Sequence, residues 1–446
     1  MTQEDFLKLC FEGRADEIED ALMEGTDPNE QAMIFGTPAS PLFVAAMENN
    51  TSAIVVLIEY GAKPADGFIA SVVTGNRKTA RLLVNIGADI NALDDNGHTA
   101  LLCAITANKP EVVRWLIELG ADVNIRTGGG YNVLTYTALM LENNRRTDGK
   151  KSEIDPEIIP LLMQNGSDYR DALTLAVKTN NINFVKELIR NGADMNIKCM
   201  DDQPPLSIAL VSVKHEVSPE MIELLASNGA DVNAKFDFGD GAVTNPLNMC
   251  VSMNRPDLAE ILLRYGANPD VRDYNGRTAL VFAVLTSEEI LDVLLENGAD
   301  PNIPDNDGRT PLMLAAVDGT CDSEVAEKLI THGADVNIQD NDGVTALMWA
   351  VTGRDRSTDF LLSGLIRTGG IRAEGFESWL ALVSLYSAVR REIQLDTIRM
   401  LIIHGADVNL RDEKDMNALT YAMMNDDKVI ADMLISAGSE IDFNMI

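Results

Sequence analysis

The chain has only four histidines and five cysteines with which to carry acid–base, nucleophilic or metal chemistry. No Ser or Cys is combined with a histidine in a pattern typical of nucleophilic catalysis. His332 and His404 hold equivalent places in a repeated pattern, two repeats apart, so stacked helices would separate them by about 20 Å. His98 is expected at a hairpin tip and His215 in a turn between helices. We therefore predict no catalytic, cofactor-binding or metal-binding residue.

The cysteines are odd in number and scattered along the chain. Their spacing fits neither a disulfide framework nor a zinc knuckle, and it favours a reducing compartment. They are Cys10, Cys103, Cys199, Cys250 and Cys321.

Two further patterns resemble ligand-binding loops but lack the residues that such loops need. The turns that begin at Asp305 and Asp340 are rich in Asp, but their twelfth positions are Ala316 and Val351, where a calcium loop carries a bidentate Glu. The glycines of residues 128–130 lack the following Lys and Ser or Thr of a phosphate loop. Turn formation and a long hairpin explain these patterns.

The formal net charge of −33 arises from 69 acidic and 36 basic residues. Such a surface repels nucleic acid and anionic membranes, because phosphate contacts need clustered Lys and Arg. The sequence begins with an acidic segment that does not resemble a signal peptide, and it holds no run of 18 uncharged apolar residues. We expect a monomeric, cytoplasmic protein without a membrane or nucleic-acid partner.

A five-residue string, Gly-Ala-Asp-Val-Asn or a near relative, recurs along the chain after runs of Leu and Ile. A regular period of this kind predicts a repeat architecture rather than a few globular domains. Thirteen glycines mark the units: Gly25, Gly61, Gly87, Gly120, Gly166, Gly192, Gly229, Gly266, Gly298, Gly333, Gly369, Gly405 and Gly438.

The unit of residues 94–124 shows how one repeat is expected to fold. The string Asp-Asn-Gly at residues 95–97 favours a tight turn, and Thr99 can cap the helix that follows. Pro110 suits the first turn of a second helix, and Gly120 suits a left-handed C-terminal cap. One repeat therefore contains a turn and two antiparallel helices.

This unit resembles the ankyrin repeat, which has a period of about 33 residues and a Thr-Pro-Leu-His signature. Related strings begin at Thr99, Thr278, Thr310 and Thr345, but none of them has the histidine. We therefore expect the usual hydrogen bond from that histidine to the turn to be missing, with softer turns as a result. The resemblance implies an all-α ankyrin-repeat solenoid, with helix-turn-helix repeats and projecting β-hairpin loops. A single domain of about 13 repeats would cover residues 1–446.

Three junctions depart from the repeat pattern. Asn or Asp stands four residues after ten of the glycines, whereas Ala65, Arg170 and Ala373 take that place in the other three units. Because an Asn or Asp side chain can bond to nearby backbone and hold an exposed hairpin, we expect these three junctions to lack one. They lie near residues 61–66, 166–171 and 369–374.

An insertion near residues 142–156 separates the two helices of one repeat. It holds the most basic stretch of the chain, from Arg145 to Lys151. This stretch is either a solvated loop or a contact for an acidic partner.

The resemblance implies a non-enzymatic scaffold that binds another protein through its concave face and hairpin tips. The acidic charge leaves open a basic partner, including an acidic decoy that sequesters a nucleic-acid-binding protein, and an enzyme is the third class considered. The sixth to eleventh repeats would offer an uninterrupted row of hairpins with exposed aromatic and Arg side chains. The candidate binding residues are Phe236, Phe238, Tyr274, Asn275, Arg277, Asn306, Asp307, Arg309, Asn341, Asp342 and Val344, together with Asp95, Asn96 and His98 in the earlier unit.

Overall fold

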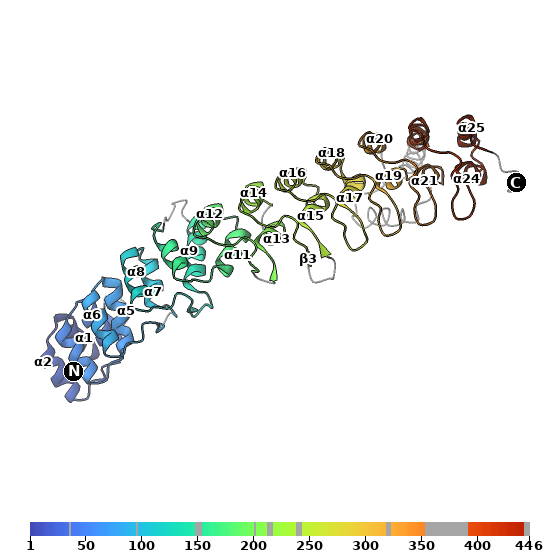
Figure 1. The fold of residues 1–446 in the computed structure, drawn as a ribbon. Helices are drawn as coiled ribbons and strands as arrows, with labels where there is room; N and C mark the ends of the chain where they lie inside the picture. The colour runs from blue at the N-terminus through green and yellow to red at the C-terminus, as the bar shows by residue number, and fades with distance from the viewer. Residues whose placement is uncertain are drawn as a thin grey trace. The chain divides into compact units, whose positions relative to one another are not determined.

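The computed structural model consists of antiparallel helix pairs joined by turns and short hairpins (Figure 1). It divides into two compact units, residues 1–224 and 225–446, and each unit is described by itself. The predicted helical repeat architecture is confirmed. The structure describes residues 1–34, 37–94, 97–147, 154–199, 202–211, 217–237, 243–317, 323–352 and 391–440.

Unit 1 contains six helix pairs and leads into a seventh. The pairs are α1 (Gln3–Glu12) with α2 (Ala15–Met23), α3 (Pro41–Met47) with α4 (Thr51–Glu59), α5 (Pro64–Thr74) with α6 (Arg77–Asn85), α7 (Ala100–Thr106) with α8 (Pro110–Glu118), α9 (Val133–Thr147) with α10 (Ile158–Gln164), α11 (Arg170–Lys178) with α12 (Ile182–Arg190), and α13 (Pro205–Val211) with α14 (Pro219–Ser227), which crosses the unit boundary. A small hairpin joins β1 (Ala32–Ile34) to β2 (Thr37–Ala39), with Met33 opposite Pro38.

Unit 2 continues the pattern with a second small hairpin and five described helix pairs. The hairpin joins β3 (Phe236–Asp237) to β4 (Val243–Thr244), with Phe236 opposite Thr244. The pairs are α15 (Pro246–Ser252) with α16 (Pro256–Arg264), α17 (Ala279–Thr286) with α18 (Glu288–Glu296), α19 (Pro311–Ala315) with α20 (Ser323–Thr331), α21 (Ala346–Thr352) with the helix of residues 391–403, and α24 (Ala418–Met424) with α25 (Lys428–Ser436).

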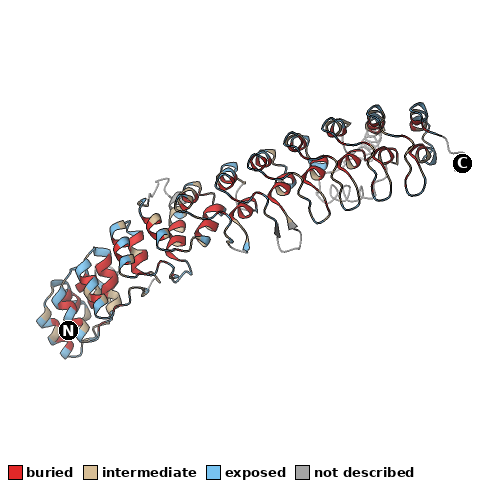
Figure 2. Ribbon diagram, viewed as in Figure 1, coloured by how far each residue is buried: buried red, intermediate tan, exposed pale blue. Residues whose placement is uncertain are grey.

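The α7–α8 pair forms as its sequence predicts. The Thr99 hydroxyl accepts a hydrogen bond from the Leu102 backbone N–H and caps α7, while Pro110 occupies the first turn of α8. Val113 and Leu116 are fully buried on the inner stripe of α8. Burying such a side chain contributes about 1.5–3 kcal/mol, so tertiary packing supports these short helices. Figure 2 shows buried residues on the helix faces that meet and exposed residues on the outer faces.

First helices of successive pairs pack against one another within each unit. In unit 1, α3 contacts α5 and α5 contacts α7, and in unit 2 the contacts run from α15 through α17, α19 and α21 to α24. Each pair therefore completes its core with its neighbours, as expected for a solenoid. Among the described residues, every helix is too short or too polar to cross a lipid bilayer.

The recurring five-residue string closes each second helix. At the end of α8, Gly120 has a φ of 97°, and the Ala121 N–H donates to the Leu116 carbonyl at 3.0 Å. A glycine adopts this left-handed conformation without a steric penalty. Asp122 then accepts a hydrogen bond from the Asn124 backbone N–H at 2.8 Å, which fixes the turn that follows.

The Asn of the string forms a bridge to the next stacked repeat. Asn124 donates to the Gly166 carbonyl at 2.8 Å and accepts from the Asp168 N–H at 2.6 Å. The expectation that this side chain holds its own hairpin is therefore corrected, because its partners lie in the next helix-capping turn. The same pair of bonds is made by Asn29, Asn233, Asn302, Asn337 and Asn409.

Helices directly follow two of the glycines that lack the Asn. After Gly61, α5 begins at Pro64, and after Gly166, α11 begins at Arg170. At the second of these junctions the Tyr169 hydroxyl accepts a hydrogen bond from the Asp194 N–H at 2.9 Å. Tyr169 thus bonds to the backbone position that a bridging Asn serves elsewhere.

One bridge does not follow the order of the glycines. Asn337 bonds to the Gly405 carbonyl and the Asp407 N–H, and Gln394 in the helix of residues 391–403 donates to the Ala350 carbonyl of α21. The glycine spacing instead predicts a repeat at Gly369 between these two. Gly369 and residues 370–374 lie outside the described residues, but α21 and the helix of residues 391–403, the described elements on either side, contact each other as one helix pair.

We expect Leu294→Ala to destabilise unit 2 by about 2–5 kcal/mol, because Leu294 in α18 is fully buried and its truncation leaves a cavity. Hydrogen exchange should show the loss of protection in α18 and in the helix pairs next to it. Equal loosening along the whole chain would contradict contacts restricted to neighbouring repeats.

We expect Asn302→Ala to cost about 1–2 kcal/mol, because it removes the bonds to the Gly333 carbonyl and the Asp335 N–H while water can reach both groups. Urea unfolding would measure this cost, and exchange of the Asp335 amide should accelerate. Asn297→Ala is the matched control, since the Asn297 side chain bonds only to the Val293 carbonyl of its own helix. An equal loss of protection at Asp335 in both variants would rule out a bridging role.

Candidate functional site

Each long turn of unit 2 is organised by one aspartate. In the turn before α17, the Asp273 carboxylate accepts hydrogen bonds from the backbone N–H groups of Asn275 and Arg277, both at 2.8 Å. The Asp273 and Arg277 backbones also pair across the turn. Asp305, Asp340 and Asp412 make the same two carboxylate bonds in the next three turns.

Hydrogen bonds also connect each turn to the next. The Asn306 backbone N–H donates to the Asn275 carbonyl at 2.9 Å, and the Asn306 side chain donates to the Tyr274 carbonyl at 3.0 Å. Asn341 bonds in the same way to the carbonyls of Asp307 and Asn306. Six of the predicted binding residues therefore lie in this ladder, and the amides of Asn306 and Asn341 have a structural role there. The sixth, Asp342, accepts a hydrogen bond from the Glu413 N–H.

The first helices of unit 2 present a row of half-buried apolar side chains beside these turns. Each member stands four residues after the N-cap of its helix, and neighbouring positions of the helix are buried. We call this set the apolar row: Met249, Phe282, Leu314, Trp349 and Tyr421. These residues are not among those predicted from the sequence, although their constant offset from the N-cap is visible in it.

Two of the predicted arginines lie against the apolar row. The Arg277 guanidinium carbon is 5.1 Å from the centre of the Phe282 ring, and that of Arg309 is 5.6 Å from the centre of the Trp349 ring. Arg277 also pairs with Asp273 at 3.4 Å, and Arg309 pairs with its neighbouring carboxylate, Asp307, at 2.8 Å. Cation–π contact and ion pairing together orient both side chains over the row.

Two members of the row also bond to the turn aspartates. The Trp349 indole N–H donates to Asp340 at 3.0 Å, and the Tyr421 hydroxyl donates to Asp412. Burial, followed by the bond to Asp412, raises the pKa of Tyr421. In the repeat of Thr345 the missing histidine bond is thus replaced by one from the next position of the helix, Trp349. Tyr421 supplies the same bond in a repeat outside the four Thr strings.

The remaining predicted residues of unit 2 are Tyr274, Val344, Phe236 and Phe238. Tyr274 is 66% exposed, and it lines a cavity of about 150 Å³ together with Lys235 and Arg272. Val344 is half-buried and its backbone N–H donates to Asp340. Phe236 lies in β3, and Phe238 lies outside the described residues.

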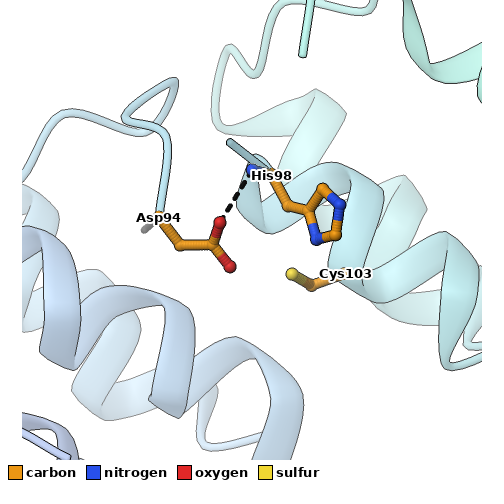
Figure 3. Close-up of side chains that lie close together, drawn as sticks. All are labelled: Asp94, His98 and Cys103. Carbon is orange, nitrogen blue, oxygen red and sulfur yellow. Dashed lines mark hydrogen bonds between the residues drawn. The ribbon is translucent and has the colours of Figure 1, made fainter. Parts of the chain in front are cut away.

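In unit 1, the turn before α7 brings three potential metal-ligating side chains together (Figure 3). Ligand atoms of Asp94, His98 and Cys103 all lie within 4.8 Å of one another, and all three residues are half-buried. His98 was predicted from the sequence to lie at a hairpin tip, and this cluster was not predicted. Asp95 and Asn96 lie outside the described residues, as do Lys150 and Lys151 of the basic insertion.

Comparison with known proteins supports the repeat assignment. The family described as "Ankyrin repeats (3 copies)" matches residues 67–127, 151–236, 219–305 and 287–368. The ankyrin repeat and KH domain-containing protein mask-1 of Caenorhabditis elegans is 26% identical over 298 residues, which are 62% of this chain and 11% of that protein. The E3 ubiquitin-protein ligase Ufd4 of Drosophila melanogaster is 33% identical over 104 residues, 23% of this chain and 4% of that protein.

The chain thus spans only a small part of either curated relative. The crystal structure of the ankyrin repeat domain of Bcl-3, described as a unique member of the IkappaB protein family, matches 59% of this chain and 97% of that chain, with 25% identity and a TM-score of 0.43. The family match alone covers more than half of the sequence and follows the helix pairs described above. The chain belongs to the ankyrin repeat family.

Proposed function

We propose that unit 2 binds another protein across the face formed by its long turns and the apolar row. Ankyrin repeats mediate protein–protein interaction, and the fold is a non-enzymatic interaction module. The observation that carries the proposal is the uninterrupted row itself. Five first helices in succession place a large apolar or aromatic side chain at a half-exposed position, and contiguous exposed apolar surface marks interaction sites.

Unit 1 provides an internal comparison for this row. At the same offset from the N-cap, Phe6, Val44, Leu173 and Ile208 are all buried. The half-buried positions Cys103 and Tyr136 are therefore flanked by repeats that offer no apolar contact there. Because binding energy concentrates in clusters of aromatic and Arg side chains, unit 2 is the better docking surface.

The chemistry of the face indicates the kind of partner. Arg277 and Arg309 hold positive charge over aromatic rings, while Asp307, Asp342 and Glu413 add negative charge in the turns of Asp305, Asp340 and Asp412. A partner segment with apolar anchors and charged groups of both signs fits this combination. A decoy for basic proteins would instead bind over broad acidic surface, with affinity that falls steeply as salt screens the charges.

A photo-cross-linking amino acid at Leu314 should capture the partner from native lysate, whereas the same group at exposed Glu260 on α16 should not. With the captured protein purified, we expect Tyr274→Ala and Phe282→Ala each to weaken binding at least tenfold, because both remove aromatic contact area.

Tyr265→Ala is the matched control, since Tyr265 is an exposed tyrosine at the end of α16 rather than in a turn. Calorimetry of each variant, with circular dichroism to verify folding, would measure the effects. Unchanged affinity in both Tyr274→Ala and Phe282→Ala would contradict the proposed face. Affinity that falls steeply with salt concentration but is unchanged by either substitution would favour the acidic decoy.

A further inference from the structure

We propose that Asp94, His98 and Cys103 form a binding site for a divalent metal ion of the zinc class. The three side chains come from one turn and the first helix after it, within unit 1 (Figure 3). They contribute a carboxylate oxygen, an imidazole nitrogen and a sulfur. The proposal is independent of the protein-binding face in unit 2.

The register between turn and helix explains why these residues meet. In three of the four long turns of unit 2, one or both of the side chains four and nine positions after the turn aspartate contact its carboxylate or each other. Arg277 pairs with Asp273 and lies over Phe282, while Trp349 and Tyr421 donate to Asp340 and Asp412. In the turn of Asp94 the same two positions hold His98 and Cys103.

The residue types at these two positions distinguish this turn from the others. The unit 2 turns carry Arg, Arg, Val and Met at the first position and Phe, Leu, Trp and Tyr at the second. Those side chains stack, pack or donate a hydrogen bond, and none of them is a usual metal ligand. His and Cys at the corresponding places are the two residues that zinc prefers, beside a carboxylate that the fold already supplies.

Local contacts restrict the geometry of the cluster before any metal binds. The His98 backbone N–H donates to an oxygen of the Asp94 carboxylate at 2.7 Å. The His98 ring packs edge-on against Tyr136, with ring centres 5.6 Å apart. Cys103 is held on α7, whose N-cap Thr99 bonds to Leu102. Partial immobilisation of this kind lowers the entropy that ligand side chains lose on binding.

The separation of the ligand atoms is close to what a tetrahedral site requires. Zinc bonds of about 2.0–2.3 Å to oxygen, nitrogen and sulfur place ligand atoms roughly 3.3–3.7 Å apart. The ligand atoms lie within 4.8 Å of one another, so side-chain rotations that move them by about 1 Å would bring them to these separations. Three protein ligands leave one coordination position for water or for a group from another molecule.

Binding would exchange a proton for the metal at sulfur. Burial, with a smaller effect of the Asp94 charge, raises the pKa of the Cys103 thiol to about 11, so the thiol is protonated near neutral pH. The metal forms a bond to sulfur, the S–H bond breaks, and the proton passes to solvent. No change of oxidation state is involved.

Cobalt(II) is a suitable probe, because thiolate coordination gives a charge-transfer absorption that oxygen and nitrogen ligands alone do not. The full chain, freed of metal and kept reduced, should bind one equivalent with this absorption, and zinc should displace the cobalt. We expect the absorption to vanish in Cys103→Ala and the affinity to fall at least tenfold in His98→Ala. Cys199→Ala and His332→Ala are matched controls that should leave both unchanged.

A second measurement uses the unaltered chain and does not depend on the folding of a variant. Zinc should slow alkylation of Cys103 at least tenfold, as followed by peptide mass spectrometry. Cys199, another half-buried free thiol, is the internal control and should react at the same rate with and without zinc. Absence of the thiolate–cobalt absorption, or equal alkylation of Cys103 in both conditions, would overturn the proposal.

Discussion

The stacking of the repeats depends on backbone groups whose hydrogen-bond partners lie in the preceding repeat. At six places a second helix ends in a glycine turn whose carbonyl, and the N–H two residues later, both bond to the side chain of one Asn from the preceding repeat. The side chain of Asn matches this pair of groups because it carries one donor and one acceptor on the same amide. The bridge therefore fixes the register between repeats as well as their contact.

A constant register has a direct effect on surface chemistry. The turn aspartate, the N-cap and the exposed side of the first helix recur at fixed offsets, so the same two positions always flank the carboxylate. In unit 2 the second of these positions holds Phe, Leu, Trp or Tyr, which belong to the apolar row, and the first holds an Arg in two turns. In the turn of Asp94 they hold His and Cys. One backbone arrangement thus supports two different kinds of surface.

The sequence predicts what depends on short spacings and fails where distant residues meet. The Thr99 cap, the Pro110 helix start and the Gly120 C-cap are local, and the structure has all three. The partner of Asn124 lies 42 residues away, so its bridging bonds could not be recognised from the string alone. The apolar row required knowledge of which side of each first helix its neighbours leave uncovered. The cluster at Asp94 required the register of a turn against a helix, which spacing does not reveal.

The bond from Asn337 to Gly405 shows that distance along the chain and position in the stack are separate quantities. The Asn337 bond joins two neighbouring repeats, and the bond from Gln394 to Ala350 joins the two helices of the second one, although residues 353–390 lie between those helices in the sequence. The entropy of closing a connection grows only slowly with its length, so a connection between two helices of one repeat can lengthen at small thermodynamic cost. Such a position lets a repeat protein acquire new sequence while its ladder of bridges stays continuous.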